Sequence, residues 1–329
     1  MLRFLIRRFV SLIVTLFAVS VVAFAIIQLP PGDFLTSYIT NLAADGQATS
    51  QAVVDKLREN YGLDQSVVIQ YGKWMSNILF RGDFGQSFEW NRPVEEVVWS
   101  RMSMTLILSA FTLMFTWMVA LPIGVYSAVK QYSAGDYLTT IIGFIGVAVP
   151  DFLISLVLMY VAFKYFNQSV GGLFSQDFEN AAWSWDRVVD LLSHLWIPVI
   201  IIGLSGTASL IRVMRANLLD ELRKPYVITA RARGLPEWKV VMKYPVRVAL
   251  NPFISTVGWV LPGLVSGSII VAVVLSLPTA GPLLLKSLLT QDMYLAGAFI
   301  LLLSVLTMVG TLASDILLAL VDPRIRYSR

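Results

Sequence analysis

The sequence has 329 residues, of which 57% are hydrophobic and only 14% are charged, and its mean hydropathy is +0.71. Soluble domains carry about a quarter charged residues, so this composition excludes an ordinary soluble protein and predicts a multi-pass membrane protein. The sequence contains no cysteine, which excludes disulfides and thiolate metal sites. The net charge of +4 follows from the way charge is distributed along the chain, and we predict no nucleic-acid partner.

Six apolar segments are long enough to cross a lipid bilayer, which takes about 20 helical residues. Arg3, Arg7 and Arg8 precede the first segment and place the N-terminus in the cytoplasm by the positive-inside rule. Six crossings return the C-terminus to the same side. The predicted fold is all-α and transmembrane, N-in/C-in, with spans at 9–29, 104–129, 137–163, 195–213, 248–277 and 294–321.

The distribution of charge supports this orientation. The segments predicted to be cytoplasmic carry 16 basic and five acidic residues, and the rest of the chain carries 9 basic and 16 acidic; the cytoplasmic segments are 1–8, 130–136, 212–247 and 322–329. An excess of Lys and Arg is typical of cytoplasmic loops. The first span could also be read as a signal peptide cleaved near residues 23–25, although its apolar stretch is long enough to remain as an anchor.

A region of about 70 residues, 30–102, separates the first two spans and is predicted to be extracytoplasmic. Ser50 is a candidate helix start and Gly62 a helix stop. Apolar residues at helical spacing predict a helix over 65–80, followed by a turn at Arg81-Gly82-Asp83. Residues 93–101 predict an amphipathic helix that lies on the membrane before the second span. We expect this region to meet a substrate or a delivering protein, and a solvated cap that only joins two helices is the alternative.

The second predicted outside loop, 164–193, is rich in aromatic residues. Such residues form belts at membrane interfaces, and a contribution to substrate passage by ring stacking is the alternative; the aromatics are Phe174, Phe178, Trp183, Trp185 and, just beyond the loop, Trp196. The third outside loop, 276–293, predicts a turn and a short amphipathic helix.

Prolines and glycines recur inside the predicted spans. Prolines predict kinks, and they are Pro122, Pro150, Pro198 and Pro262. Small residues allow helices to approach closely, and the glycines are paired as Gly143/Gly146, Gly203/Gly206 and Gly263/Gly267. We interpret the glycines as packing residues.

The sequence carries none of three common enzyme signatures in working form. Gly203-Leu204-Ser205-Gly206 resembles the motif of intramembrane serine proteases, but His194 would lie on the same helix, roughly 16 Å from Ser205 at 1.5 Å per residue. That is far beyond the ~3 Å that a nucleophile and its base require. The sequence also has no H-E-x-x-H and no phosphate-binding loop. We predict no catalytic residue and no metal site.

Asp151 and Asp315 fall within predicted spans. A charge at the bilayer centre costs about 2.5–3.5 kcal/mol on insertion scales, so both side chains should face protein or water. Helix capping and hydrogen bonding between helices are the expected roles. A place on the translocation path, or in a proton relay, is the alternative.

The most charged stretch between two apolar segments is 226–247. It predicts one short helix over Tyr226–Arg233, a break at Gly234, and a second short helix from Glu237. The residues Ala230, Ala232 and Gly234 are small, and small residues would not hold a docking partner away. Leu235 and Trp238 offer apolar anchors, and Arg231, Arg233 and Glu237 could form ion pairs with a partner; the candidate contact residues are Tyr226, Thr229, Ala230, Arg231, Ala232, Arg233, Gly234, Leu235, Glu237 and Trp238.

This stretch resembles the coupling loop of ABC importer permeases. TARARGL is similar to the T-A-R-A-K-G-L run of the B-type permease subunits of the dipeptide/oligopeptide/nickel group, although Ile228 stands where the founding motif has Glu. The resemblance covers almost the whole chain and includes MLRFLIRR, LPPGDF, ENYGLDQSVVIQY, RGDFGQSF, HLWIP, ALNPFI and DPRIR.

The resemblance implies a type I importer permease in a prokaryotic cytoplasmic membrane. The expected domains are 1–29 (first span), 30–102 (extracytoplasmic insertion) and 103–329 (core permease), with the coupling loop at 214–247. The implied partners are a second homologous permease, two ABC ATPases and an extracytoplasmic solute-binding protein. ATP and Mg²⁺ would bind those ATPases, and no cofactor is expected on this chain.

The solute is expected to be an oligopeptide or an oligosaccharide. The aromatic loop 164–193 and the run QLPPGDFLTSYI favour the sugar. The alternative function is a proton-coupled carrier that uses Asp151 or Asp315.

Overall fold

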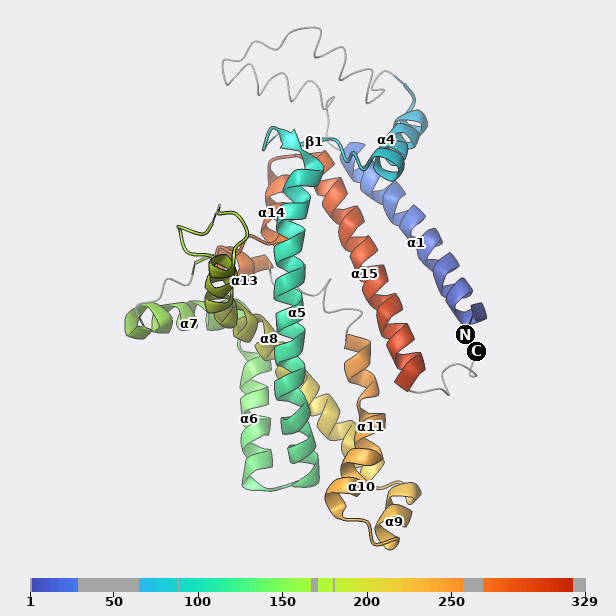
Figure 1. The fold of residues 1–329 in the computed structure, drawn as a ribbon, viewed down its shortest axis with the longest axis vertical. Coiled ribbons are helices and arrows are strands. Elements are labelled where there is room, and N and C mark those ends of the chain that lie inside the picture. Colours follow the sequence, from blue (N-terminus) through green and yellow to red (C-terminus); the bar gives the residue numbers. More distant parts are fainter. Residues whose placement is uncertain are drawn as a thin grey trace. The chain divides into compact units, whose positions relative to one another are not determined.

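The computed structural model describes residues 2–28, 65–87, 89–166, 171–179, 181–256 and 269–321. Within these ranges the regular structure is helical apart from a short antiparallel hairpin (Figure 1). The elements are α1 Leu2–Gln28, α4 Val67–Arg81, β1 Gln86–Ser87, β2 Arg92–Pro93, α5 Val94–Val129, α6 Ala134–Ala148, α7 Asp151–Phe166, α8 Trp185–Leu222, α9 Pro225–Ala232, α10 Glu237–Lys243, α11 Pro245–Ala249, α13 Ile269–Val274, α14 Ala280–Leu289 and α15 Met293–Val321.

Four of the described helices are long and apolar enough to cross a membrane: α1 (from Arg8), α5, α8 and α15. Helices α6 and α7 meet the same test only as a pair, which would make a fifth span. The described residues therefore form a mostly helical membrane protein with four to five candidate spans. Helix α8 is longer than the predicted span 195–213 because its polar ends continue the helix on both sides.

The predicted span 137–163 is not one continuous helix. Helices α6 and α7 are bent by 104° at Val149-Pro150. Val149 is extended, with φ −88° and ψ 127°, because the ring of a following proline disfavours helical backbone at the residue before it. Pro150 thus separates two helices, which is a stronger effect than the kink that the sequence suggested.

The chain divides into two compact units. Unit 1 comprises Met1–Leu5, Met104–Pro282 and Leu306–Arg329, and unit 2 comprises Ile6–Ser103 and Leu283–Val305. Helices α5 and α15 contribute to both. The predicted domain ranges group the residues differently and stay a prediction.

In unit 2, helix α1 packs against α4 through aromatic rings. The ring of Phe24 lies 5.5 Å from that of Tyr71 and 5.6 Å from that of Trp74. Helix α4 ends at Gly82, whose φ of +68° makes the left-handed C-cap that favours glycine. The predicted helix over 65–80 and the turn after it are confirmed.

The predicted separate helix at 93–101 is wrong. No glycine or proline interrupts the chain between Pro93 and Pro122, and α5 runs unbroken from Val94. The apolar stripe itself was recognised correctly, but Val94, Val97 and Val98 are buried in protein. They are therefore core residues of unit 2 and do not lie on a membrane surface.

The hairpin of unit 2 is attached to α15. The Ser87 hydroxyl donates to the Asp292 carboxylate at 2.5 Å, and this carboxylate also lies at the start of α15. The helix predicted in the loop 276–293 is confirmed as α14, which follows a turn with Ser276 at a φ of +51°.

Unit 1 contains two apolar cores along α8. One joins α8 to α5, α7 and α13 around Leu195, Ile201 and Leu275. The other joins α8 to α5, α10 and α11 around Met214 and Phe253.

The glycines of α6 and α8 lie at helix contacts. A Cβ on Gly146 would be 3.4 Å from that of Ala208 on α8, and a Cβ on Gly203 would be 2.8 Å from the ring of Phe115 on α5. The packing interpretation of Gly146 and Gly203 is therefore confirmed.

Several predicted features fall outside the described residues. They are the helix from Ser50 to Gly62, the middle of the span 248–277 with Pro262, Gly263 and Gly267, and the cytoplasmic tail 322–329.

Candidate functional site: the two-helix loop and its support on α8

The predicted two-helix loop is present in unit 1. Helix α9 begins with Pro225 at its first position, where the missing N–H costs nothing, and ends before Arg233. Gly234 then adopts a φ of +74°, a conformation that costs an L-residue roughly 1–2 kcal/mol. Pro236 caps α10 and Glu237 occupies its first turn. The local structure predicted from the glycine and proline positions is confirmed.

One face of each short helix is buried. Val227 and Ala230 of α9 meet Val240 of α10 in a small apolar core, against which Leu222 and Tyr244 pack. Ala230 therefore serves the interior of the loop, and its small side chain lets the two helices approach.

The opposite face is exposed and apolar. Trp238 is 66% exposed and Ile228 57% exposed, and Leu235, Met242 and Tyr226 are also exposed. Ile228 and Met242 were missed by the sequence interpretation. For Met242 the sequence held a signal in its helical spacing, because it follows Trp238 by four residues and so lies on the same exposed face.

Arg231 and Glu237 bind each other across the Gly234 corner. The Arg231 Nη2 atom lies 2.6 Å from Glu237 Oε1, and Nε lies 3.0 Å from Oε2. This hydrogen-bonded pair (the loop pair) lowers the pKa of the Glu237 carboxyl and raises that of the Arg231 guanidinium. The sequence interpretation assigned both residues to ion pairs with a partner, whereas in the structure they join α9 to α10. Arg233, which the sequence interpretation also assigned to a partner, is exposed.

The loop is carried by α8. Val241 of α10 and Val246 of α11 are buried in the same core as Met214 and Leu218 of α8. Helix α8 continues to Leu222, so the first part of the predicted coupling loop 214–247 is the end of that long helix. The short helices are thus packed directly on a candidate span.

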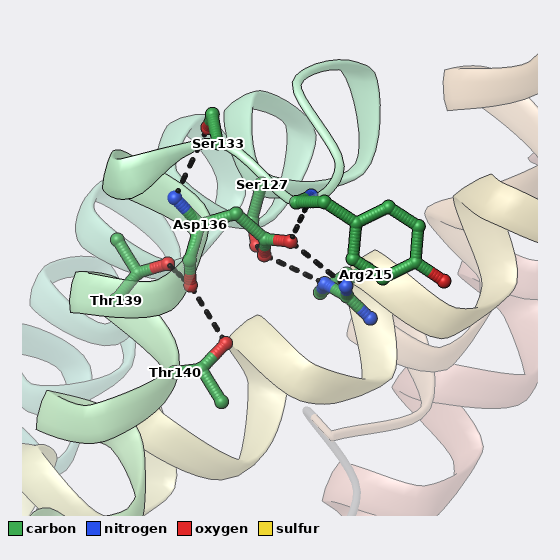
Figure 2. Close-up of polar contacts among 7 residues, drawn as sticks. Ser127, Ser133, Asp136, Thr139, Thr140 and Arg215 are labelled. Carbon is green, nitrogen blue, oxygen red and sulfur yellow. Dashed lines mark hydrogen bonds and ion pairs between the residues drawn. The ribbon is translucent and has the colours of Figure 1, made fainter.

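Arg215, next to Met214 on α8, forms an ion pair that the sequence interpretation missed (Figure 2). Its Nε and Nη2 atoms donate to the two carboxylate oxygens of Asp136 at 2.8 and 2.9 Å. We call these two residues the buried pair, because the Asp136 side chain is 3% exposed and that of Arg215 27%. The available signal was an acid just before one predicted span and a base just beyond the end of another.

The turn before α6 is built around the same carboxylate. Asp136 accepts hydrogen bonds from the Ser127 hydroxyl and from the backbone N–H of Tyr132, the latter at 2.8 Å. The Asp136 N–H in turn donates to the Ser133 hydroxyl, which caps α6 (Figure 2). All of the carboxylate's partners are therefore local groups except Arg215, which lies 79 residues away.

The two aspartates proposed for the translocation path lie on different helices. Asp151 is the first residue of α7, and its side chain lies near Ser205 of α8. Its expected structural role stays a prediction. Asp315 lies on α15. His194 and Ser205 both lie on α8, as the argument against a protease required.

An arginine near the start of α8 contacts two aromatic rings of the preceding loop. The Arg187 guanidinium lies 4.7 Å from the ring centre of Phe174 and 4.8 Å from that of Trp183. Such cation–π contacts hold the loop against the start of α8. Two of the aromatics that suggested sugar stacking therefore have a partner within the chain.

Residues 120–327 match the family described as binding-protein-dependent transport system inner membrane component, and residues 1–110 match its N-terminal counterpart. The chain belongs to this family. It is therefore a permease subunit in a prokaryotic inner membrane.

The relatives of this permease are named for peptides. The oligopeptide transport system permease AppB of Bacillus subtilis is 34% identical, the glutathione transport system permease GsiC of Escherichia coli K12 is 33% identical, and the dipeptide transport system permease DppB of Alkalihalophilus pseudofirmus is 30% identical. Each match covers 99% of this chain and 100% of the relative. These relatives favour neither the oligosaccharide nor the proton-coupled carrier.

Proposed function

We propose that this permease passes the motion of an ATPase to the membrane through α9 and α10. The observation that carries the proposal is the division of these helices into a buried face, which packs on α8, and an exposed apolar face with Leu235, Trp238 and Met242. Exposed apolar patches mark interaction sites. Arg233, Lys239 and Lys243 add positive charge to the same segment, so the fitting partner has an apolar groove bordered by acidic residues.

The complete transporter in this proposal has five subunits. A second homologous permease completes the translocation path, two ATPases bind ATP and Mg²⁺, and an extracytoplasmic binding protein delivers the solute. This chain then has six spans with both termini in the cytoplasm and an extracytoplasmic region at 30–102. The family description and the peptide systems named for the relatives support this composition. The same relatives support peptides as the solute.

The mechanism follows from this arrangement. The loaded binding protein docks outside, ATP closes the ATPase dimer, and the pushed α9–α10 loop opens the path outward. Hydrolysis then resets the path inward. Uptake of peptide by a reconstituted transporter with catalytically inactive ATPases would contradict it.

Gly234 allows a sharp test of the docking surface. A Cβ at this position would meet nothing within 4 Å, so Gly234→Ala and Gly234→Trp carry the same backbone strain and differ only in the bulk they present outward. We expect both variants to insert into the membrane. Gly234→Trp should lose co-purifying ATPase and peptide uptake, and Gly234→Ala should keep most of both.

The alanine variant is the matched control for strain. Equal uptake by the two variants would mean that the corner does not face the ATPase, and the proposed docking surface would then be wrong.

A further inference from the structure

The buried pair holds together two segments that are distant in sequence. Arg215 binds both oxygens of Asp136, and the same carboxylate holds the Tyr132 N–H in the turn between α5 and α6. Tyr132 has a φ of +66°, which a non-glycine residue adopts only when its surroundings favour it. The shape of this turn and its attachment to α8 therefore depend on one carboxylate.

Gly135, the second residue of α6, lies against Tyr126 near the end of α5. A Cβ on Gly135 would clash with the ring and hydroxyl oxygen of Tyr126. The turn therefore closes tightly on the end of α5, and Asp136 follows directly in the chain.

The same stretch of α8 carries the two-helix loop. Met214 and Leu218 flank Arg215, and both are fully buried in the core that contains Val241 and Val246. On another side, a Cβ on Gly124 of α5 would lie 2.6 Å from that of Met214. Helices α5 and α8 are thus in backbone-to-side-chain contact at the level where the loop is attached.

A buried ion pair is poor evidence for stability, since two well-packed apolar residues often serve as well. What such a pair does provide is a defined geometry, because a bidentate Arg–carboxylate contact fixes both the distance and the orientation of the two side chains. The contact between α6 and α8 continues through Gly146 and Ala208, but glycine and alanine surfaces can slide past one another. The ion pair cannot slide without breaking two charge-assisted hydrogen bonds.

We propose that Asp136 and Arg215 are positioning residues for transport, which make α6 move with α8 when α9 and α10 are pushed. This inference rests on the proposed function of the loop. The pair does not touch the ATPase in this scheme; it converts a displacement of α8 into a displacement of the whole α5–α6–α8 group.

The test uses the complete transporter in proteoliposomes with its binding protein and a labelled peptide. Asp136→Asn removes the charge with little change in shape, and Arg215→Lys keeps the charge but not the two-point contact. Exposed residues at and just after the end of α8 supply matched controls, Asp220→Asn and Arg223→Lys. Measured quantities are co-purifying ATPase, basal ATP hydrolysis, and the ratio of peptide imported to ATP hydrolysed.

We expect Asp136→Asn to assemble with its ATPases and hydrolyse ATP, while the ratio of peptide to ATP falls at least about fivefold, the scale of a typical coupling free energy. Arg215→Lys should show a smaller fall, and the two controls should match the unaltered protein. Unchanged ratios in Asp136→Asn and Arg215→Lys would overturn the proposal.

Failure of both pair variants to assemble would also overturn it, since the pair would then serve folding and not coupling. The proposed docking surface fails differently. If Gly234→Trp kept its ATPase, the loop would be excluded as the contact, whatever the ratio measured for the pair variants.

Discussion

Two arginine–carboxylate pairs in unit 1 have the same chemistry and different surroundings. In the buried pair the side chains are 27% and 3% exposed, and in the loop pair they are 42% and 55% exposed. Both are held by more than one hydrogen bond. We expect burial, and not the bond itself, to decide how much of the structure depends on such a pair.

Sequence separation adds to this difference. Arg231 and Glu237 are six residues apart, whereas Asp136 and Arg215 are 79 apart. Closing a short loop costs little entropy, so the loop pair can form whenever its two helices form. The buried pair can form only where α6 and α8 lie side by side, and it then fixes their register.

The largest expected effect comes from leaving one partner of the buried pair alone. Arg215→Met keeps the length of the side chain but leaves Asp136 as an uncompensated buried charge, and should cost about 3–5 kcal/mol of unfolding free energy. Arg231→Met is the matched control at the loop pair and should cost roughly 0–1 kcal/mol. Unfolding of the purified permease in mixed micelles, followed by circular dichroism, measures both. If both variants lost the same unfolding free energy, burial would not distinguish the buried pair from the loop pair.

A smaller effect tests the packing beside the buried pair. Gly124→Ala would place a Cβ 2.6 Å from the Met214 Cβ and 3.2 Å from a backbone oxygen of Ile211. Overpacking of this kind costs about 1–3 kcal/mol. Gly206→Ala on α8 is the control, because its nearest neighbour would be 4.0 Å away.

We expect Gly124→Ala alone to lower the thermal stability of the purified permease. If both glycine variants were equally stable, the close approach of α5 and α8 would not contribute to holding the buried pair in place.

The smallest effect is the pH dependence of the loop pair. Because Arg231 lowers the pKa of Glu237 in the folded protein, the contribution of the pair is complete above the unfolded value of about 4.3. It is lost as the pH falls through the lower, folded pKa. Glu237→Gln should therefore be less stable than the unaltered protein by at most roughly 1 kcal/mol between pH 5 and 8.

Below about pH 4.3 this difference should shrink. Thermal unfolding of the two proteins across this pH range measures it, and a difference that grew toward acid pH would show that the sign is wrong.

The sequence by itself determined the features that depend on neighbouring residues. Long apolar runs predicted the membrane class and located α1, α5, α8 and α15, and helical spacing followed by Gly82 predicted α4 and its end. Gly234 between two short amphipathic patterns predicted the corner of the loop. These are local properties, because propensity, periodicity and the left-handed conformation of glycine act over a few residues.

Only the tertiary structure decided which side chains meet. Val94, Val97 and Val98 form an amphipathic pattern that fits a membrane surface as well as a protein core. In the folded protein all three are buried in the core. Asp136 and Arg215 looked like two of many loop charges until α6 lay beside α8. Arg231 pairs with Glu237 of the same loop, although both side chains are exposed. Charge and periodicity identify the apolar and polar faces of a helix. They do not identify the segment that packs on each face, because that depends on contacts between residues far apart in the chain.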